Sequence, residues 1–353
     1  MVCEISKQKS PLLPDRLAQS DFFVCDIFDA APKGDMASME HPIFSLSTKP
    51  DRGIRRYEHG GKWLEITPSV KGLATIHDRD VLIYCISQVM AALNDDRDIS
   101  QTLRFKAYDL LKATNRMSNG QGYDGLRMAL ERLRGTTIVT NVTTGDAEVL
   151  DGFGLIESFK IVRETREGRM QEVEIKLSDW VFNAIRHREV LTLHRDYFRL
   201  RKPLERRIYE LARKHCGHKD EWSITLALLQ KKCGSNSTPR EFKRLVSHII
   251  EQDQTHHHIP DYAITLEDGD KVTFRNRRTM KAPYPAEDAS LVGRLDTDTY
   301  QAARERAPGW DVHYLEDAWH RWMEEGGQEP PRNPDSAFLG FCTKWFERRG
   351  RPT

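Results

Sequence analysis

The chain is poor in the features that mark membrane, secreted and nucleotide-hydrolysing proteins. Its 353 residues include six cysteines, which show neither a CxxC pair nor a disulfide-rich spacing. No apolar run approaches the roughly 18 residues of a transmembrane helix, and no secretory signal pattern is found. A GxxxxGKS/T phosphate-binding loop is also missing. We therefore expect a cytoplasmic protein in a reducing compartment, which neither enters a membrane nor hydrolyses ATP.

The net charge of the chain is also small, but the charged residues are unevenly distributed along it. The formal net charge is +1, although 30% of the residues are charged. Between Arg186 and Lys219, eleven lysines and arginines outnumber four acidic residues. Between Glu287 and Glu329 the ratio is reversed, with eleven acidic residues and four arginines. The basic middle indicates a polyanionic partner, and the acidic C-terminal part indicates a different one.

The segment from Gly122 to Asn141 predicts a short amphipathic helix that runs directly into a strand. Apolar residues from Leu126 to Leu133 recur at helical spacing, while arginines occupy the opposite face. We expect Gly135 to end the helix as a left-handed C-cap, and the β-branched run after it to form a strand. Taken alone, this pattern fits any amphipathic surface helix beside a sheet.

The same succession of three helices and a β-hairpin is predicted twice. In the first copy Asp78 is placed as an N-cap. In the second copy Thr238, Pro239 and Glu241 form a capping box at the start of the third helix. The helices are predicted at Val81–Leu93, Leu103–Thr114, Gly122–Gly135, Pro203–Lys214, Thr225–Lys232 and from Pro239 onward, and the hairpin strands at Ile156–Glu164, Met170–Leu177, Ile259–Leu266 and Lys271–Phe274.

A helix-turn-helix followed by a β-hairpin describes a winged helix, whose third helix enters the major groove of DNA while the hairpin contacts the backbone. Two such units in series are harder to explain as surface decoration than one basic helix. We therefore predict an α+β protein with tandem winged-helix domains and a small C-terminal helical module. The predicted divisions are an N-terminal arm (1–40), a first winged-helix domain for DNA contact and dimerisation (41–185), a second for DNA binding (186–279), and a linker with the C-terminal module (280–353).

The C-terminal module is rich in tryptophan and acidic residues. It holds Trp310, Trp319, Trp322 and Trp345, four of the seven tryptophans in the chain. Helices are predicted near Thr297–Arg306, Val312–Glu325 and Pro334–Arg348. The aromatic residues indicate a small core, and the acidic charge indicates a module that docks on a host protein.

The predicted DNA contacts lie on the third helices, on neighbouring elements and on the second hairpin. They are Lys112, Arg116, Arg127, Arg132, Arg134, Arg206, Arg207, Arg240, Lys243, Arg244, Ser247, Arg275, Arg277 and Arg278. Arginine side chains on a recognition helix can read guanine in the major groove, whereas lysines and hairpin arginines more often hold phosphates.

Three other motifs are better explained by structure than by chemistry. The run GQGYDG (Gly120 to Gly125) matches a dinucleotide-binding pattern, but a helix precedes it where a strand is needed. His256 to His258 with Tyr262 is a weak match to nucleases with a metal-binding histidine pair, and HCGH (His215 to His218) with Cys233 fits no common zinc spacing. We predict no catalytic residue, metal site or cofactor.

Four segments give the chain a family resemblance: DFFVCDIFDAAPKGDMASMEHPIFSLS, GLATIHDRDVLIYCISQVMAALN, LRGTTIVTN and ERRIYELARKHCG. Over about its first 280 positions it resembles the plasmid replication initiator protein A family of bacteria. The resemblance implies an initiator that binds direct repeats of double-stranded origin DNA, helps to open the duplex and loads the host replicative helicase. It also implies copy control, because related initiators often repress their own gene as homodimers and act at the origin as monomers.

Two other classes of function stay open at this point. A transcriptional regulator with two winged helices would bind one operator near a promoter. A tyrosine nuclease-type initiator would nick origin DNA with a divalent metal and a nucleophile such as Tyr262. An array of direct repeats beside the gene would favour the initiator over the regulator.

Overall fold

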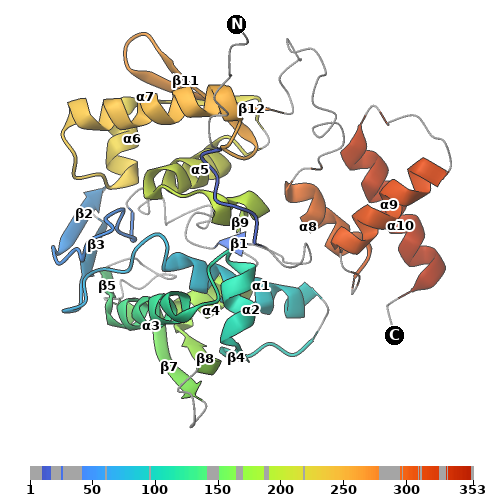
Figure 1. The fold of residues 1–353 in the computed structure, drawn as a ribbon, viewed down its shortest axis with the longest axis horizontal. Helices are drawn as coiled ribbons and strands as arrows, with labels where there is room; N and C mark the ends of the chain where they lie inside the picture. Colours follow the sequence, from blue (N-terminus) through green and yellow to red (C-terminus); the bar gives the residue numbers. More distant parts are fainter. Residues whose placement is uncertain are drawn as a thin grey trace, which may run out of the picture.

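The structure is a computed structural model with α+β architecture and antiparallel sheets (Figure 1). It describes residues 10–16, 25–26, 42–59, 62–94, 97–140, 151–163, 170–186, 191–217, 219–277, 295, 297–308, 310, 312–325, 331 and 333–350. None of the helices within these ranges is both long and apolar enough to cross a membrane.

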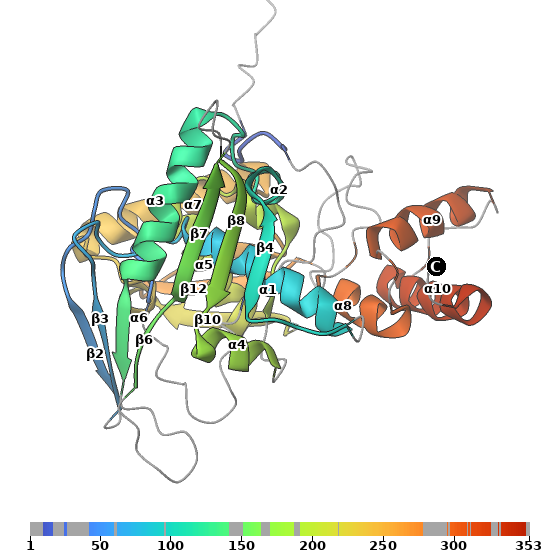
Figure 2. The ribbon, with the colours of Figure 1, turned by 90° about the horizontal axis from the view of Figure 1, so that it is seen from below.

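The first unit comprises the elements from β2 to α4. Its central elements follow the order helix, strand, helix, helix and hairpin. They are α1 (Arg79–Asn94), β4 (Thr102–Lys106), α2 (Ala107–Ala113), α3 (Gly120–Gly135), β7 (Ile156–Arg163) and β8 (Met170–Leu177). The hairpin joins β4 in a three-stranded sheet with the order β4-β8-β7, and α3 packs against β7 (Figure 2). Helix α4 (Asp179–Arg186) follows the hairpin.

The second unit, from α5 to β12, repeats this order. Its elements are α5 (Pro203–His215), β10 (Glu221–Thr225), α6 (Leu226–Cys233), α7 (Pro239–His256), β11 (Tyr262–Glu267) and β12 (Lys271–Asn276). The sheet order is β10-β12-β11, so the strand after the first helix again pairs with the second strand of the hairpin. The predicted repetition of three helices and a hairpin is therefore present in the topology.

The short strands β4 and β10 differ from the prediction. Residues Leu103 to Lys106 are predicted as the start of a helix, but they form β4, and the helix begins at Ala107. The alternating exposure along β4 lets it pair with β8 over five residues. Pairing with a distant strand decides this conformation, which a local helical pattern cannot anticipate.

A second sheet in the first unit explains why α3 ends where it does. It has the order β2-β3-β5-β6, formed by β2 (Arg55–His59), β3 (Lys62–Thr67), β5 (Thr137–Thr140) and β6 (Asp151–Gly154). Gly135 does not have the left-handed conformation predicted for a C-cap. A Cβ at Gly135 would lie 2.6 Å from the Cβ of Ser69, so close packing against the segment after β3 requires glycine here.

The buried apolar residues form three clusters. One lies in the first unit, and one lies in the second unit but includes Ile83 of α1. The third lies among α8 (Thr297–Arg306), α9 (Val312–Glu325) and α10 (Pro334–Arg349), where Trp319 packs against Phe338 with ring centroids 5.5 Å apart. These three helices stand to one side of both units (Figure 1), and their predicted ranges agree with the structure within one residue.

Parts of the predicted N-terminal arm lie against the rest of the fold. Strand β1 (Cys25–Asp26) pairs with β9 (Leu191–Thr192), which leads into a 3₁₀ helix at Arg195–Arg199. The Leu13 N–H donates to the carbonyl of Arg199, and the Arg16 N–H donates to Asn115 Oδ1. Residues 13 and 16 therefore bind the 3₁₀ helix before the second unit and Asn115 of the first unit.

Candidate nucleic-acid interface

Helix α7 is the best-formed part of the candidate interface. Thr238 caps its N-terminus by accepting a hydrogen bond from the Glu241 N–H, and Pro239 occupies the first turn. Phe242, Val246 and Ile249 are buried on one face. The predicted contacts Arg240, Lys243 and Arg244 are exposed on the other face, and Ser247 is partly exposed. The sequence pattern therefore predicts this helix and its exposed side correctly.

Acidic neighbours hold two of these cations in place. The Arg244 guanidinium donates two hydrogen bonds to Glu241, at 2.8 and 2.7 Å, which lowers the pKa of the Glu241 carboxyl. Lys243 Nζ lies 2.6 Å from Asp270 Oδ1, in the turn of the β11–β12 hairpin. Exposed ion pairs of this kind contribute little to stability, so a phosphate or a base edge can replace the acid as partner.

The arginines of the β11–β12 hairpin have different environments. Arg275 is 40% exposed and lies between Glu221 and Glu267, at 3.4 and 3.2 Å. Arg277 instead donates to the buried Asp253 of α7, at 2.6 Å. Arg277 therefore fixes the hairpin to α7, which differs from its predicted role as a phosphate contact. Arg278 lies outside the described residues.

Helix α3 presents fewer cations than its sequence predicts. Its apolar stripe from Leu126 to Leu133 is fully buried, and Asn119 caps its N-terminus. Arg134 is exposed, and Arg127 is 43% exposed with Glu131 at 3.7 Å. Lys112, on α2, is partly exposed and lies over the Tyr108 ring.

Arg132 and Arg116 join the helices of the first unit to one another. Arg132 donates two hydrogen bonds of 2.7 Å to Asp78, which also accepts from the Thr75 N–H. The Asp78 carboxylate therefore binds Arg132 and the Thr75 N–H, and its role as the N-cap of α1 stays a prediction. Arg116 donates to the carbonyl of His77 and lies 3.4 Å from Asp80. Both arginines have intramolecular partners where the sequence predicts DNA contacts.

Arg206 and Arg207 are not available to DNA in this structure, and their prediction as DNA contacts is wrong. They are 3% and 4% exposed and belong to a buried ionic network between α1 and α5. Arg206 Nη1 lies 2.6 Å from Asp80, and Arg207 donates to Glu210 and to the carbonyl of Lys232. A buried guanidinium needs such partners, because an unpaired buried charge is very costly.

The same network joins the two units through their first helices. Arg79 of α1 lies 2.6 Å from Glu210 of α5, and Tyr197 donates to the other oxygen of Glu210 at 2.6 Å. Burial raises the pKa of Asp80, which Arg206 and Arg116 only partly oppose. Because both first helices share these ion pairs, the network fixes the orientation of one unit relative to the other.

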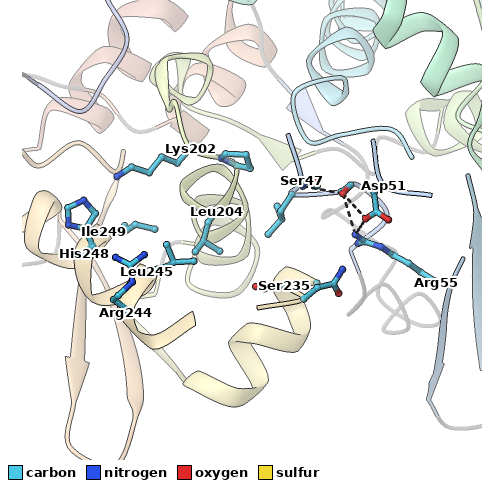
Figure 3. A pocket seen from close by; sticks show the side chains of 15 residues that line it. Ser47, Asp51, Arg55, Lys202, Leu204, Ser235, Arg244, Leu245, His248 and Ile249 are labelled. Carbon is cyan, nitrogen blue, oxygen red and sulfur yellow. Dashed lines mark hydrogen bonds and ion pairs between the residues drawn. The ribbon is translucent and has the colours of Figure 1, made fainter. Parts of the chain in front are cut away.

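A cleft lies between α7 and the segment that leads into β2 (Figure 3). Its volume is about 470 Å³, and Arg244, Leu245 and Ile249 line it on the side of α7. Arg55 and Lys202 line it as well, and they are not among the predicted contacts. Arg55 donates to Asp51 at 2.5 Å. No local pattern marks Arg55, because chain folding alone brings it opposite α7.

The residues weighed for nuclease or zinc chemistry have structural roles. Tyr262 is 1% exposed, its hydroxyl donates to the carbonyl of Gly217, and burial raises its pKa. His258 is buried 3.3 Å from Glu205, and Cys233 is a buried free thiol. Within the described part of the chain, no group of three or more histidine, cysteine or acidic side chains is arranged to hold a metal ion.

Comparisons with known proteins connect this arrangement to replication. A family model described as Replication initiator protein A matches residues 33–264. A protein of Wigglesworthia glossinidia brevipalpis whose name assigns it to replication is 36% identical over 277 residues, which are 77% of this chain and 98% of that protein. Two crystal structures of domains 2 and 3 of RctB, one of them from selenomethionine derivatives, each align with a TM-score of 0.49 and 15% identity. They cover 67% and 71% of this chain and 96% and 98% of their own.

Proposed function

The chain belongs to the replication initiator protein A family, and we propose that it initiates plasmid replication by binding double-stranded origin DNA through two winged helices. In this proposal α3 and α7 are the recognition helices, and the hairpins β7–β8 and β11–β12 are the wings. The protein then helps to open the duplex and recruits host replication proteins.

The repeated topology supports the assignment of winged helices. In each unit a strand between the first two helices pairs with the hairpin that follows the third helix. The third helix of each unit is capped at its N-terminus and buries one apolar face. In this proposal its opposite face, which carries exposed arginines, enters a major groove about 12 Å wide.

The surface of α7 is the observation that carries the proposal. Arg240, Lys243 and Arg244 project from one face of the helix, and Arg275 lies on the hairpin behind it. Lys202, whose side chain is 40% exposed, lines the cleft beside this surface, whereas Arg55 is only 10% exposed and is paired with Asp51. Such a surface can follow a phosphate backbone while one or two arginines reach base edges.

The remaining parts of the proposal follow from the family. Direct repeats at the origin would each take one chain, and a homodimer would repress the gene of the protein. The host replicative helicase or a host initiator protein would bind as partner. We also propose that the protein has no catalytic activity, which the burial of Tyr262 supports because a nucleophile must reach the DNA backbone.

The test uses two arginines that are matched in exposure and in partner. Arg244 on α7 is 66% exposed and pairs with one glutamate, and Arg104 on β4 is 63% exposed and pairs with one glutamate. Arg244→Ala should weaken binding to origin repeats by about 1–3 kcal/mol in a gel-shift titration, while Arg104→Ala should leave it unchanged. Equal effects of the two substitutions would contradict a reading role for α7.

A further inference from the structure

A groove between α9 and α10 is the most distinctive feature outside the DNA-binding surface. Its volume is about 570 Å³. Trp322 and Met323 of α9 form one wall, and Phe341 and Trp345 of α10 form the other. Trp322 is 48% exposed, which is high for so large an apolar side chain. Exposed aromatic side chains beside a groove are typical of anchor sites for a protein partner.

Gly340 in the middle of α10 keeps the floor of this groove open. Glycine in a helix interior is less stabilising than alanine, so the presence of glycine at this position requires a structural or functional explanation. A Cβ at Gly340 would meet no atom within 4 Å, so the packing of the protein itself does not require glycine. The residue lines the groove, and its missing side chain allows an incoming group to approach the backbone of α10.

The charges around the groove indicate what it binds. Lys344, Arg348 and Arg349 line it along the C-terminal half of α10, and none of the described residues that line it is acidic. These cations contrast with the acidic composition of the sequence from Glu287 to Glu329, which includes α9. A local group of cations beside an apolar floor is complementary to a short segment with an apolar face and acidic flanks.

Single-stranded DNA fits this site less well than a protein segment. Base stacking needs open aromatic faces, but the Arg349 guanidinium already lies over the Trp345 ring at 4.1 Å from its centroid. The edge-to-face contact of Trp310 with Trp345, at 5.4 Å, further restricts that ring. A long polyanion would also extend beyond the three cations of the groove, whereas a short acidic flank would meet only these cations.

We propose that the α9–α10 groove binds an acidic amphipathic helix of a partner protein. The apolar side of that helix would lie against Gly340 and contact Trp322 and Phe341, and its acidic flank would face Lys344 and Arg348. If the chain initiates replication, as we propose above, the partner is a replication protein of the host. Binding of an acidic helix at the groove does not depend on that proposed function.

The test titrates the full chain with two fluorescein-labelled helical peptides of about 18 residues, or roughly five turns. Both peptides carry the same leucine-rich face, but one has glutamate flanks and the other has lysine flanks. Fluorescence anisotropy should show that the acidic peptide binds at least about tenfold more tightly, and that Lys344→Glu with Arg348→Glu reverses this preference. Equal affinities, or no binding of the acidic peptide, would overturn the proposal.

Two substitutions of Gly340 distinguish an effect of filling the groove from an effect on the stability of α10. Gly340→Trp should fill the groove and weaken binding of the acidic peptide at least about tenfold, whereas Gly340→Ala adds only a Cβ in open space and should retain it. Circular dichroism checks that both variants fold. Tighter binding of oligothymidine than of the acidic peptide, lost in Gly340→Trp, would assign the groove to single-stranded DNA and overturn the proposal.

Plasmid retention then distinguishes this inference from the proposed function. Gly340→Trp should lose the plasmid while its gel shift on origin repeats stays unchanged. If neither the unaltered chain nor any variant binds origin DNA, the proposed function is wrong, although the peptide result still holds. If Gly340→Trp binds the acidic peptide normally and retains the plasmid, the groove inference fails although origin binding stands.

Discussion

At the scale of single residues, the role of each arginine depends on its partner more than on its place in a basic stretch of sequence. Arg206 and Arg207 belong to the most basic segment of the chain, yet both are buried in ion pairs. Arg207 and Glu210 are three residues apart on α5, a spacing at which helical side chains meet. The partner of Arg206 is Asp80, which lies far away in sequence, so no local pattern could reveal that pair.

Glu210 should be the most sensitive position in this network. It accepts from Arg79, Arg207 and Tyr197 and is fully buried. Glu210→Gln would leave two guanidinium groups without their carboxylate, which should cost about 3–5 kcal/mol of unfolding free energy in urea titrations. Glu241→Gln removes an exposed partner of Arg244 and should leave the unfolding free energy almost unchanged. Similar losses in the two variants would contradict the structural role of the network.

His77 should make the stability of the fold sensitive to mild acid. Burial, followed by the positive charges of Arg206 and Arg116, holds its pKa well below the usual 6.5. The folded state therefore keeps His77 neutral, while the unfolded chain takes up a proton below pH 6.5. This contribution to stability is complete above pH 6.5 and is lost as the pH falls toward the folded pKa.

The expected slope for one such proton is at most about 1.4 kcal/mol per pH unit. His77→Gln should reduce the dependence of the unfolding free energy on pH below 6.5 by up to that amount. Urea titrations of both chains at several pH values between 8 and 5 measure it, and the difference at pH 8 corrects for other effects of the substitution. The same slope for both chains would show that His77 does not carry this linkage.

At the scale of elements, the sequence predicts what is local and misses what depends on distant pairing. The helical spacing of buried residues and the Thr238 cap place α7 correctly, and the three C-terminal helices agree with their predicted ranges. Strands β4 and β10 are short, and each pairs with a hairpin far along the chain. At the candidate site, the local pattern predicts the exposed face of α7. It does not predict Arg55, because only chain folding brings that residue to the cleft.

Two glycines of α3 test the close approach of this helix to the neighbouring loop. A Cβ at Gly135 would lie 2.6 Å from the Cβ of Ser69, whereas a Cβ at Gly125 would meet no atom within 4 Å. Gly135→Ala should therefore destabilise the protein by about 1–3 kcal/mol through overpacking. Gly125→Ala should stabilise it by up to about 1 kcal/mol through helix propensity. Thermal unfolding of both variants compares them directly, and stabilisation by Gly135→Ala would refute the packing argument.

At the scale of the whole molecule, the buried network between α1 and α5 gives the two proposed recognition helices a fixed relationship. Arg79 and Asp80 of α1 pair with Glu210 and Arg206 of α5. The segment from residue 10 to residue 16 adds hydrogen bonds to Asn115 of the first unit and to Arg199, in the 3₁₀ helix before the second unit. If these helices bind DNA as proposed, they should recognise only sites whose halves have a matching spacing.

Footprinting of the full chain on a single origin repeat tests the central claim most directly. If α3 and α7 each read one half of the site, as we propose, one chain should protect two neighbouring major grooves. Arg127→Ala should remove protection of one half, and Arg244→Ala should remove protection of the other, each with a loss of about 1–3 kcal/mol in affinity. If either substitution leaves the footprint and the affinity unchanged, that helix does not read DNA and the tandem winged-helix account is contradicted.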